Sequence, residues 1–91
     1  MRLNNTISVL IKQPGTDPER LVIENSLQAF QECINDWLEF ITADANKVLI
    51  CAENGRLKHM QANSTVNGIT IRGTFILAGI DTEGNITDYP S

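Results

Sequence analysis

Apolar residues recur at every second position near the start of the chain. Ile7, Val9 and Ile11 follow this pattern within residues 6–12, which predicts a strand with one buried face. Pro14-Gly15 predicts a turn, because proline fixes φ and glycine accepts positive φ. Residues 19–23 then indicate a short returning strand.

The spacing of apolar residues changes after residue 24. Leu27, Phe30 and Ile34 recur at intervals of three or four, which predicts one amphipathic helix over about residues 26–35. Asn25 is the expected N-cap residue. Gln28 lies three positions later, where its side chain can reach back to the cap.

Strand patterns return in the second half of the chain. Residues 38–42 alternate, residues 44–47 predict a hairpin loop, and residues 48–52 are almost continuously apolar. Asn54-Gly55 is a pair favoured in tight hairpin turns. We expect a short strand and then an extended loop in residues 56–63.

The longest strand pattern follows the Asn67-Gly68 turn and ends at a second turn in residues 81–84, after which a final strand reaches Pro90. A strand this apolar must lie inside a sheet with at least one covered face. Together these patterns predict a single α+β domain over residues 1–91. We expect a mostly antiparallel sheet of about five or six strands with the helix on one face. The expected core includes Leu27, Phe30, Ile34, Phe75 and Leu77.

Composition narrows the class of protein. The chain has 91 residues, 42% of them hydrophobic and 20% charged, as is ordinary for one globular domain. Its longest apolar run is too short to span a bilayer, and its first residues do not resemble a secretory signal, so we expect a protein of the cytosol that binds no membrane. Cys33 and Cys51 fit no metal spacing, and we expect buried, reduced thiols and no cofactor.

Charge is unevenly distributed along the chain. Residues 17–44 hold seven acids and one arginine, whereas residues 47–72 hold four lysines or arginines and one glutamate. The net charge of −4 makes general nucleic-acid binding a poor expectation, because that binding depends on neutralising phosphates. A local basic patch still suits a small anion or a short acidic surface.

The order of these motifs resembles the domain-of-unknown-function family DUF3846, small proteins of bacteriophages, plasmids and integrative elements. The matching segments are Pro14-Gly15, residues 24–31, residues 53–58, Asn63, residues 71–77, Asp81 and Gly84. The family tends to carry a Pro-Asn-Arg-like tripeptide in its polar loop, whereas this chain has Ala62-Asn63-Ser64. No ligand-binding role of that arginine therefore carries over. The resemblance implies an accessory protein of a mobile element and brings no catalytic residues.

Two surfaces are candidates for binding. The basic segment could hold a small anionic, nucleotide-derived ligand, since arginine forks, an amide and a hydroxyl suit such a group. Its candidate residues are Arg56, Lys58, His59, Asn63, Arg72 and Thr74. The acidic helix could instead contact a host protein, through Gln28, Glu32, Asp36 and Trp37.

Each surface also has a structural interpretation. The basic residues can be solvated edge and turn residues, and Trp37 can cover the core at the helix end. The single histidine lacks the partners of a catalytic constellation, so we expect a non-catalytic binding protein in the cytosol of a bacterial host. We also expect a homodimer, on the view that the long apolar strand lies near an exposed sheet edge.

Overall fold

The computed structural model describes residues 5–55 and 58–90. In these ranges the elements are β1 (Thr6–Lys12), β2 (Glu19–Glu24), α1 (Leu27–Ile34), β3 (Leu38–Asp44), β4 (Lys47–Ala52), β5 (Ala62–Val66), β6 (Ile69–Arg72), β7 (Phe75–Ile80) and β8 (Ile86–Thr87). The α+β fold with one helix and a mostly antiparallel sheet, expected from the sequence, is confirmed.

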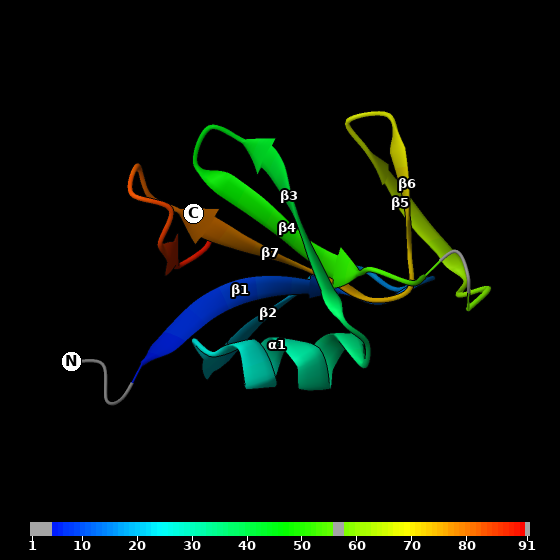
Figure 1. Cartoon of the computed structure of the whole chain (residues 1–91), viewed down its shortest axis with the longest axis horizontal. Helices are drawn as coiled ribbons and strands as arrows, with labels where there is room; N and C mark the ends of the chain where they lie inside the picture. Colours follow the sequence, from blue (N-terminus) through cyan, green and yellow to red (C-terminus); the bar gives the residue numbers. More distant parts are fainter. Residues whose placement is uncertain (1–4, 56–57, 91) are drawn as a thin grey trace.

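The main sheet has the strand order β2-β1-β7-β4-β3, and β8 pairs with the end of β7. Every pairing in it is antiparallel. Strand β7 lies in the middle of the sheet, between β1 and β4 (Figure 1). The expectation that the long apolar strand lies near an edge is therefore wrong, and the edges of this sheet are β2 and β3.

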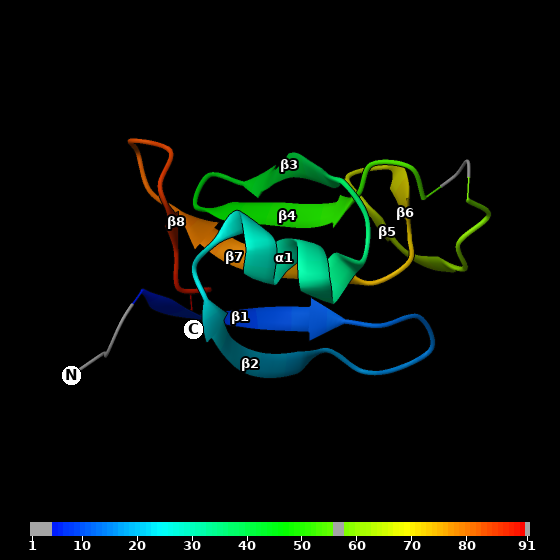
Figure 2. The same cartoon turned by 60° about the horizontal axis from the view of Figure 1, so that its bottom comes forward.

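Helix α1 covers one face of the main sheet (Figure 2). Phe30 and Ile34 are buried and pack against strand residues that include Val9, Ile50 and Ile76. Ile7, Val9 and Ile11 share this face, as their alternation predicts. These contacts hold the helix to the sheet, because apolar burial is the main favourable term in such packing.

The caps of α1 differ from the sequence expectation. Ser26 is the N-cap residue, and its Oγ accepts a hydrogen bond of 3.1 Å from the amide of Ala29. The side-chain amide of Asn25 instead donates to the carbonyl of Ile86 at 3.1 Å. Gln28 donates to Glu32 at 3.4 Å rather than reaching back to the cap. Asn35 ends the helix with φ of 62°, a left-handed conformation that asparagine tolerates.

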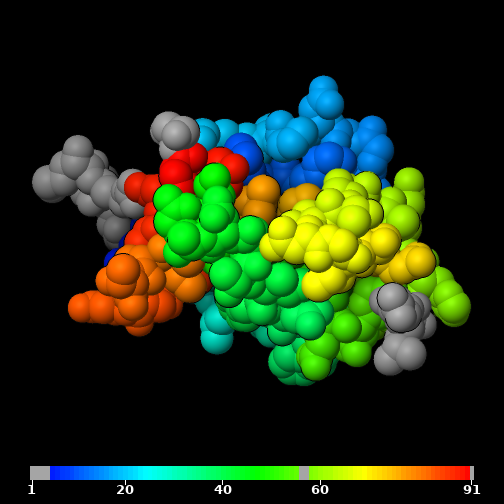
Figure 3. All heavy atoms as spheres, turned by 90° about the horizontal axis from the view of Figure 1, so that it is seen from above, coloured from blue at the N-terminus to red at the C-terminus, as the bar shows by residue number. Residues whose placement is uncertain are grey.

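The β5–β6 hairpin covers part of the opposite face. Ile71 of β6 is buried with Leu49, Cys51 and Phe75, and Leu77 packs against this second cluster. The hairpin lies over one end of the sheet, and β7 remains visible beside it in the space-filling view (Figure 3).

The predicted long strand is interrupted at Gly73. This residue has φ of 77°, which breaks the extended chain into β6 and β7 and sends the two pieces into different sheets. Phe75 and Leu77 therefore face the hairpin, while Ile76 and Ala78 face the helix. Phe75 is buried, as expected, and Leu77 is partly buried, but both lie on the face opposite the helix.

Three further expectations need correction. Leu27 is 63% exposed and does not belong to the core. The amides of Lys58 and Met60 donate to the carbonyls of Asn54 and Gly55, and the next strand among the described residues is β5, from Ala62; residues 56 and 57, where the expected strand starts, lie outside them. The final strand is β8 (Ile86–Thr87), which does not reach Pro90.

Among the described residues, no helix has the length and apolarity needed to cross a membrane.

Candidate functional site

The Asp36 carboxylate connects the two surfaces that the sequence suggested separately. It follows Asn35, the residue that caps the end of α1, and only 1% of its side chain is exposed. Its Oδ1 accepts from the amide of Trp37 at 2.8 Å and pairs with Lys58 Nζ at 3.0 Å. Its Oδ2 accepts from the amide of Asn54 at 3.2 Å. Asp36 thus ties the end of the helix to the loop after β4.

These contacts decide the charge state of Asp36. Burial acts to raise the pKa of its carboxyl group, but the hydrogen bonds from Lys58, Trp37 and Asn54 outweigh that effect. The pKa is therefore held below its ordinary value of 3.8, and Asp36 is ionised at neutral pH. Lys58 is consequently already paired with an anion of the protein itself.

Trp37 presents an exposed indole from a fixed backbone. Its side chain is 66% exposed, so it does not cover the core. Its amide donates to Asp36 Oδ1, and its carbonyl accepts from the amide of Glu53 at 2.8 Å. Beside the indole lies a shallow hollow of about 320 Å³, which we call the Trp37 hollow. It is lined by Gln31, Asn35, Asp36, Trp37 and Lys58.

Asn63 makes contacts inside the fold. Its side-chain amide donates to the carbonyls of Lys12 and Gly73, at 2.9 and 3.0 Å. Its Oδ1 accepts from Lys12 Nζ at 2.9 Å and from Ser64 Oγ at 3.1 Å. Both N–H groups and the oxygen of the Asn63 side chain therefore make hydrogen bonds within the protein. These bonds link β5 to the end of β1 and to Gly73, between β6 and β7.

The remaining residues of the basic segment do not converge on one site. Arg72 donates from Nη1 to the carbonyl of Met60 at 3.3 Å. His59 is exposed and has φ of 53°, and Thr74 is half-buried in the bend before β7. Arg56 lies outside the described residues.

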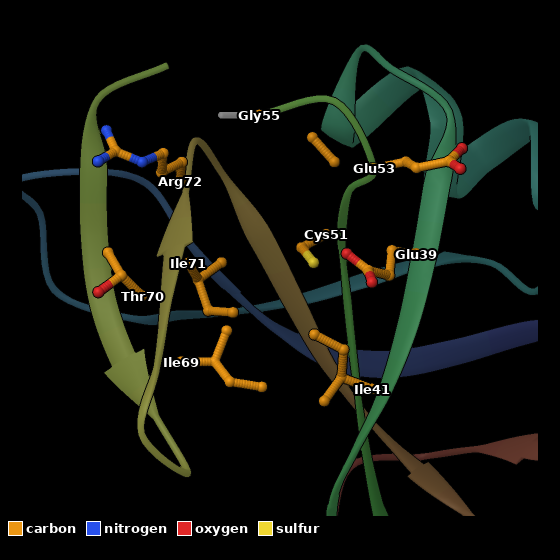
Figure 4. Close-up of a pocket in the computed structure, with 10 residues that line it drawn as sticks. Glu39, Ile41, Cys51, Glu53, Gly55, Ile69, Thr70, Ile71 and Arg72 are labelled. Carbon is orange, nitrogen blue, oxygen red and sulfur yellow. The ribbon is translucent and has the colours of Figure 1, made fainter. Parts of the chain in front are cut away.

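A groove of about 210 Å³ separates β6 from β3 and β4 (Figure 4). Ile69 and Ile71 point across it toward Ile41 and Cys51, while Thr70 and Arg72 point to the β5 side of β6. Glu39 projects into the groove, and Glu53 also lines it. The lining of this groove mixes apolar side chains with the carboxylates of Glu39 and Glu53, and its volume lies below the roughly 300–1,000 Å³ typical of small-molecule pockets.

The thiols offer little nucleophilic chemistry. Burial and the nearby Glu39 carboxylate raise the pKa of Cys51 to about 11. Burial and Glu32 likewise raise the pKa of Cys33. Because the thiolate is the reactive form, both cysteines are poor nucleophiles at neutral pH. No group of three or more potential metal-binding side chains was found in the part of the chain that the structure describes.

The sequence suggested only part of the Trp37 hollow. Asp36 and Trp37 were candidates for partner binding, and both line it. Gln28 and Glu32 lie on the exposed side of α1 and do not line it. Gln31 and Asn35 were not candidates. The sequence offered one signal for the place of Asn35: asparagine is favoured where a helix ends in the left-handed conformation, so Asn35 could have been assigned to the end of the helix, beside Asp36 and Trp37.

Comparisons with known proteins identify the family to which this chain belongs. No curated protein and no solved structure matches this chain. The family model described as "Domain of unknown function (DUF3846)" matches residues 7–91, nearly the whole chain. The protein therefore belongs to the DUF3846 family.

Proposed function

We propose that this protein is a non-catalytic accessory protein of a bacteriophage or other mobile element, and that it binds a protein of its bacterial host through the Trp37 hollow. The observation that carries this proposal is Trp37, which is 66% exposed and whose backbone is fixed by two hydrogen bonds. Because the backbone of Trp37 is already fixed, little further backbone entropy is lost when a partner covers the indole. Rigid exposed tryptophans are typical anchors of protein interfaces.

The surroundings of Trp37 suit a protein partner. Gln31 and Asn35 offer amide donors and acceptors at the rim, and the paired charges of Asp36 and Lys58 leave no strong local charge. An aromatic centre with a polar rim is the common arrangement of protein interfaces. The open shape of the hollow also favours a partner surface over an enclosed small molecule.

The alternative, a small anionic ligand bound by the basic segment, has less support. Lys58 is paired with Asp36, the Asn63 amide is used inside the fold, and Arg72 donates to a backbone carbonyl. An anion would have to compete with each of these contacts. The raised pKa values of both thiols likewise favour binding over nucleophilic catalysis.

The test is affinity capture from a bacterial host lysate with the wild-type protein, Trp37→Ala and Leu27→Ala, followed by titration with the captured protein after purification. Leu27 is a matched control, because it is also a large apolar side chain and is 63% exposed. We expect Trp37→Ala to weaken binding by about 2 kcal/mol or more, as for an interface anchor. Leu27→Ala should bind as the wild type does. Equal binding by Trp37→Ala would contradict the proposal.

A further inference from the structure

Strand β2 is an open edge of the main sheet. It pairs only with β1, and its outer side has no neighbouring strand among the described residues (Figure 2). Val22 is 65% exposed and Leu21 is 38% exposed. The pairing of β2 with β1 is regular over its whole length. Such an edge can accept another strand.

The opposite edge, β3, is less suited to pairing. Its register with β4 shifts between Thr42 and Asp44, which is a bulge that bends the strand. The side-chain amide of Asn67 also lies 3.4 Å from the carbonyl of Thr42 and 3.3 Å from that of Ala43. A bulge and occupied carbonyls both protect a sheet edge.

Hydrogen bonds made by β1 show which groups of β2 face outward. The amide of Ser8 donates to Asp88 Oδ1 at 2.8 Å, and its carbonyl accepts from Tyr89 at 2.7 Å. Ser8 therefore directs its backbone groups away from its partner Val22. Because bonded and non-bonded pairs alternate in an antiparallel ladder, Arg20 and Val22 direct their N–H and C=O groups to the open edge. Glu24 directs its N–H there as well, while its carbonyl already accepts from the amide of Ser26 at 3.0 Å.

We propose that a second copy of this chain binds this edge, with the two β2 strands antiparallel about a two-fold axis at Val22. In this arrangement Val22 pairs with Val22 of the second copy, and Arg20 pairs with Glu24 of the second copy in both directions. The two Val22 residues then exchange backbone hydrogen bonds, and the amide of Glu24 donates to the carbonyl of Arg20 of the second copy in both directions. Leu21 lies opposite Ile23 of the second copy, on the face that carries the helix.

Charge selects this register over its neighbours. Only outward-facing residues can bond to each other, so the two-fold axis must pass through a residue rather than between two. An axis at Leu21 places Glu24 opposite Pro18 and Arg20 opposite Val22, so it forms no pair of opposite charges. An axis at Ile23 places Val22 opposite Glu24. The axis at Val22 alone sets two opposite-charge pairs, and such pairs stabilise neighbouring strands.

The test is sedimentation analysis across micromolar to millimolar concentrations. Wild-type protein should dimerise. Glu24→Arg sets like charges opposite each other twice and should weaken the dimer about tenfold. Arg20→Glu should do the same, although it also removes the 2.8 Å hydrogen bond from Arg20 to Ser8. The double variant Arg20→Glu with Glu24→Arg exchanges the charges and should recover most of the affinity.

A backbone variant tests the same arrangement without charge. Val22→Pro removes an N–H that faces the open edge, so it should abolish the dimer while the monomer keeps the unfolding temperature of the wild type to within a few degrees. A wild-type protein that stays monomeric throughout would overturn the proposal. A dimer that is unaffected by Glu24→Arg would overturn the register.

Discussion

Asn63 stabilises the junction of three strands through a single side chain. Asn63→Ala removes two hydrogen bonds to carbonyls and two that its oxygen accepts. We expect a loss of about 1–3 kcal/mol of unfolding free energy, because partly buried carbonyls lose their donors. Chemical denaturation measures this loss. Ser64→Ala removes only one of these bonds and should cost clearly less; equal costs would argue against this role of Asn63.

Asp36 should make stability depend on acid pH. Its pKa is lowered in the folded protein, so its contribution is present above the ordinary value of 3.8 and is lost as the pH falls through the lower folded value. The unfolding temperature of the wild type should therefore fall more steeply below pH 3.8 than that of Asp36→Asn. Parallel pH profiles for the two proteins would show that the Lys58 pairing contributes nothing.

The roles of individual residues could be predicted only in part from the sequence. Asp36 was identified as a candidate because it belongs to the acidic surface of the helix region, and Trp37 because aromatic residues are enriched at interfaces. The hydrogen bond between Asp36 and Lys58 joins residues 22 positions apart, and no local pattern encodes it. Asn63 was interpreted as a ligand contact because a polar residue in a loop looks the same whether it faces solvent or crosslinks strands.

At the level of elements, the helix has a sharply defined buried face. Phe30 is 2% exposed and Leu27 is 63% exposed, although both fit the apolar spacing of α1. Phe30→Ala should cost about 3–5 kcal/mol of unfolding free energy, because it leaves a cavity in the core. Leu27→Ala should change stability by less than about 0.5 kcal/mol. Denaturation midpoints of the two variants check this difference, and similar midpoints would contradict the assigned face.

The long apolar segment shows why element boundaries were harder to predict. Its residues are suited to a strand throughout, and only Gly73 interrupts them. Gly73 has positive φ, and the chain leaves one sheet for another at that point. A glycine within an apolar strand is equally compatible with a bulge, so the sequence alone does not distinguish the two outcomes.

At the level of the whole molecule, local patterns predicted the kinds of element and the α+β class. The strand order was not predictable, because β7 pairs with β1 and β4, two strands that are distant from it and from each other in the sequence. That order moves the long apolar strand to the centre and leaves β2 at an edge. It also brings the loop after β4 against the end of α1, which creates the Trp37 hollow.

The central claim is that Trp37 anchors a host protein, and fluorine NMR tests it most directly. Trp37 is the only tryptophan of the chain, so fluorotryptophan labelling gives one resonance that reports on this site alone. Titration with the purified host partner should shift or broaden that resonance in proportion to the bound fraction. Complete binding of the partner with an unchanged fluorine resonance would contradict the claim.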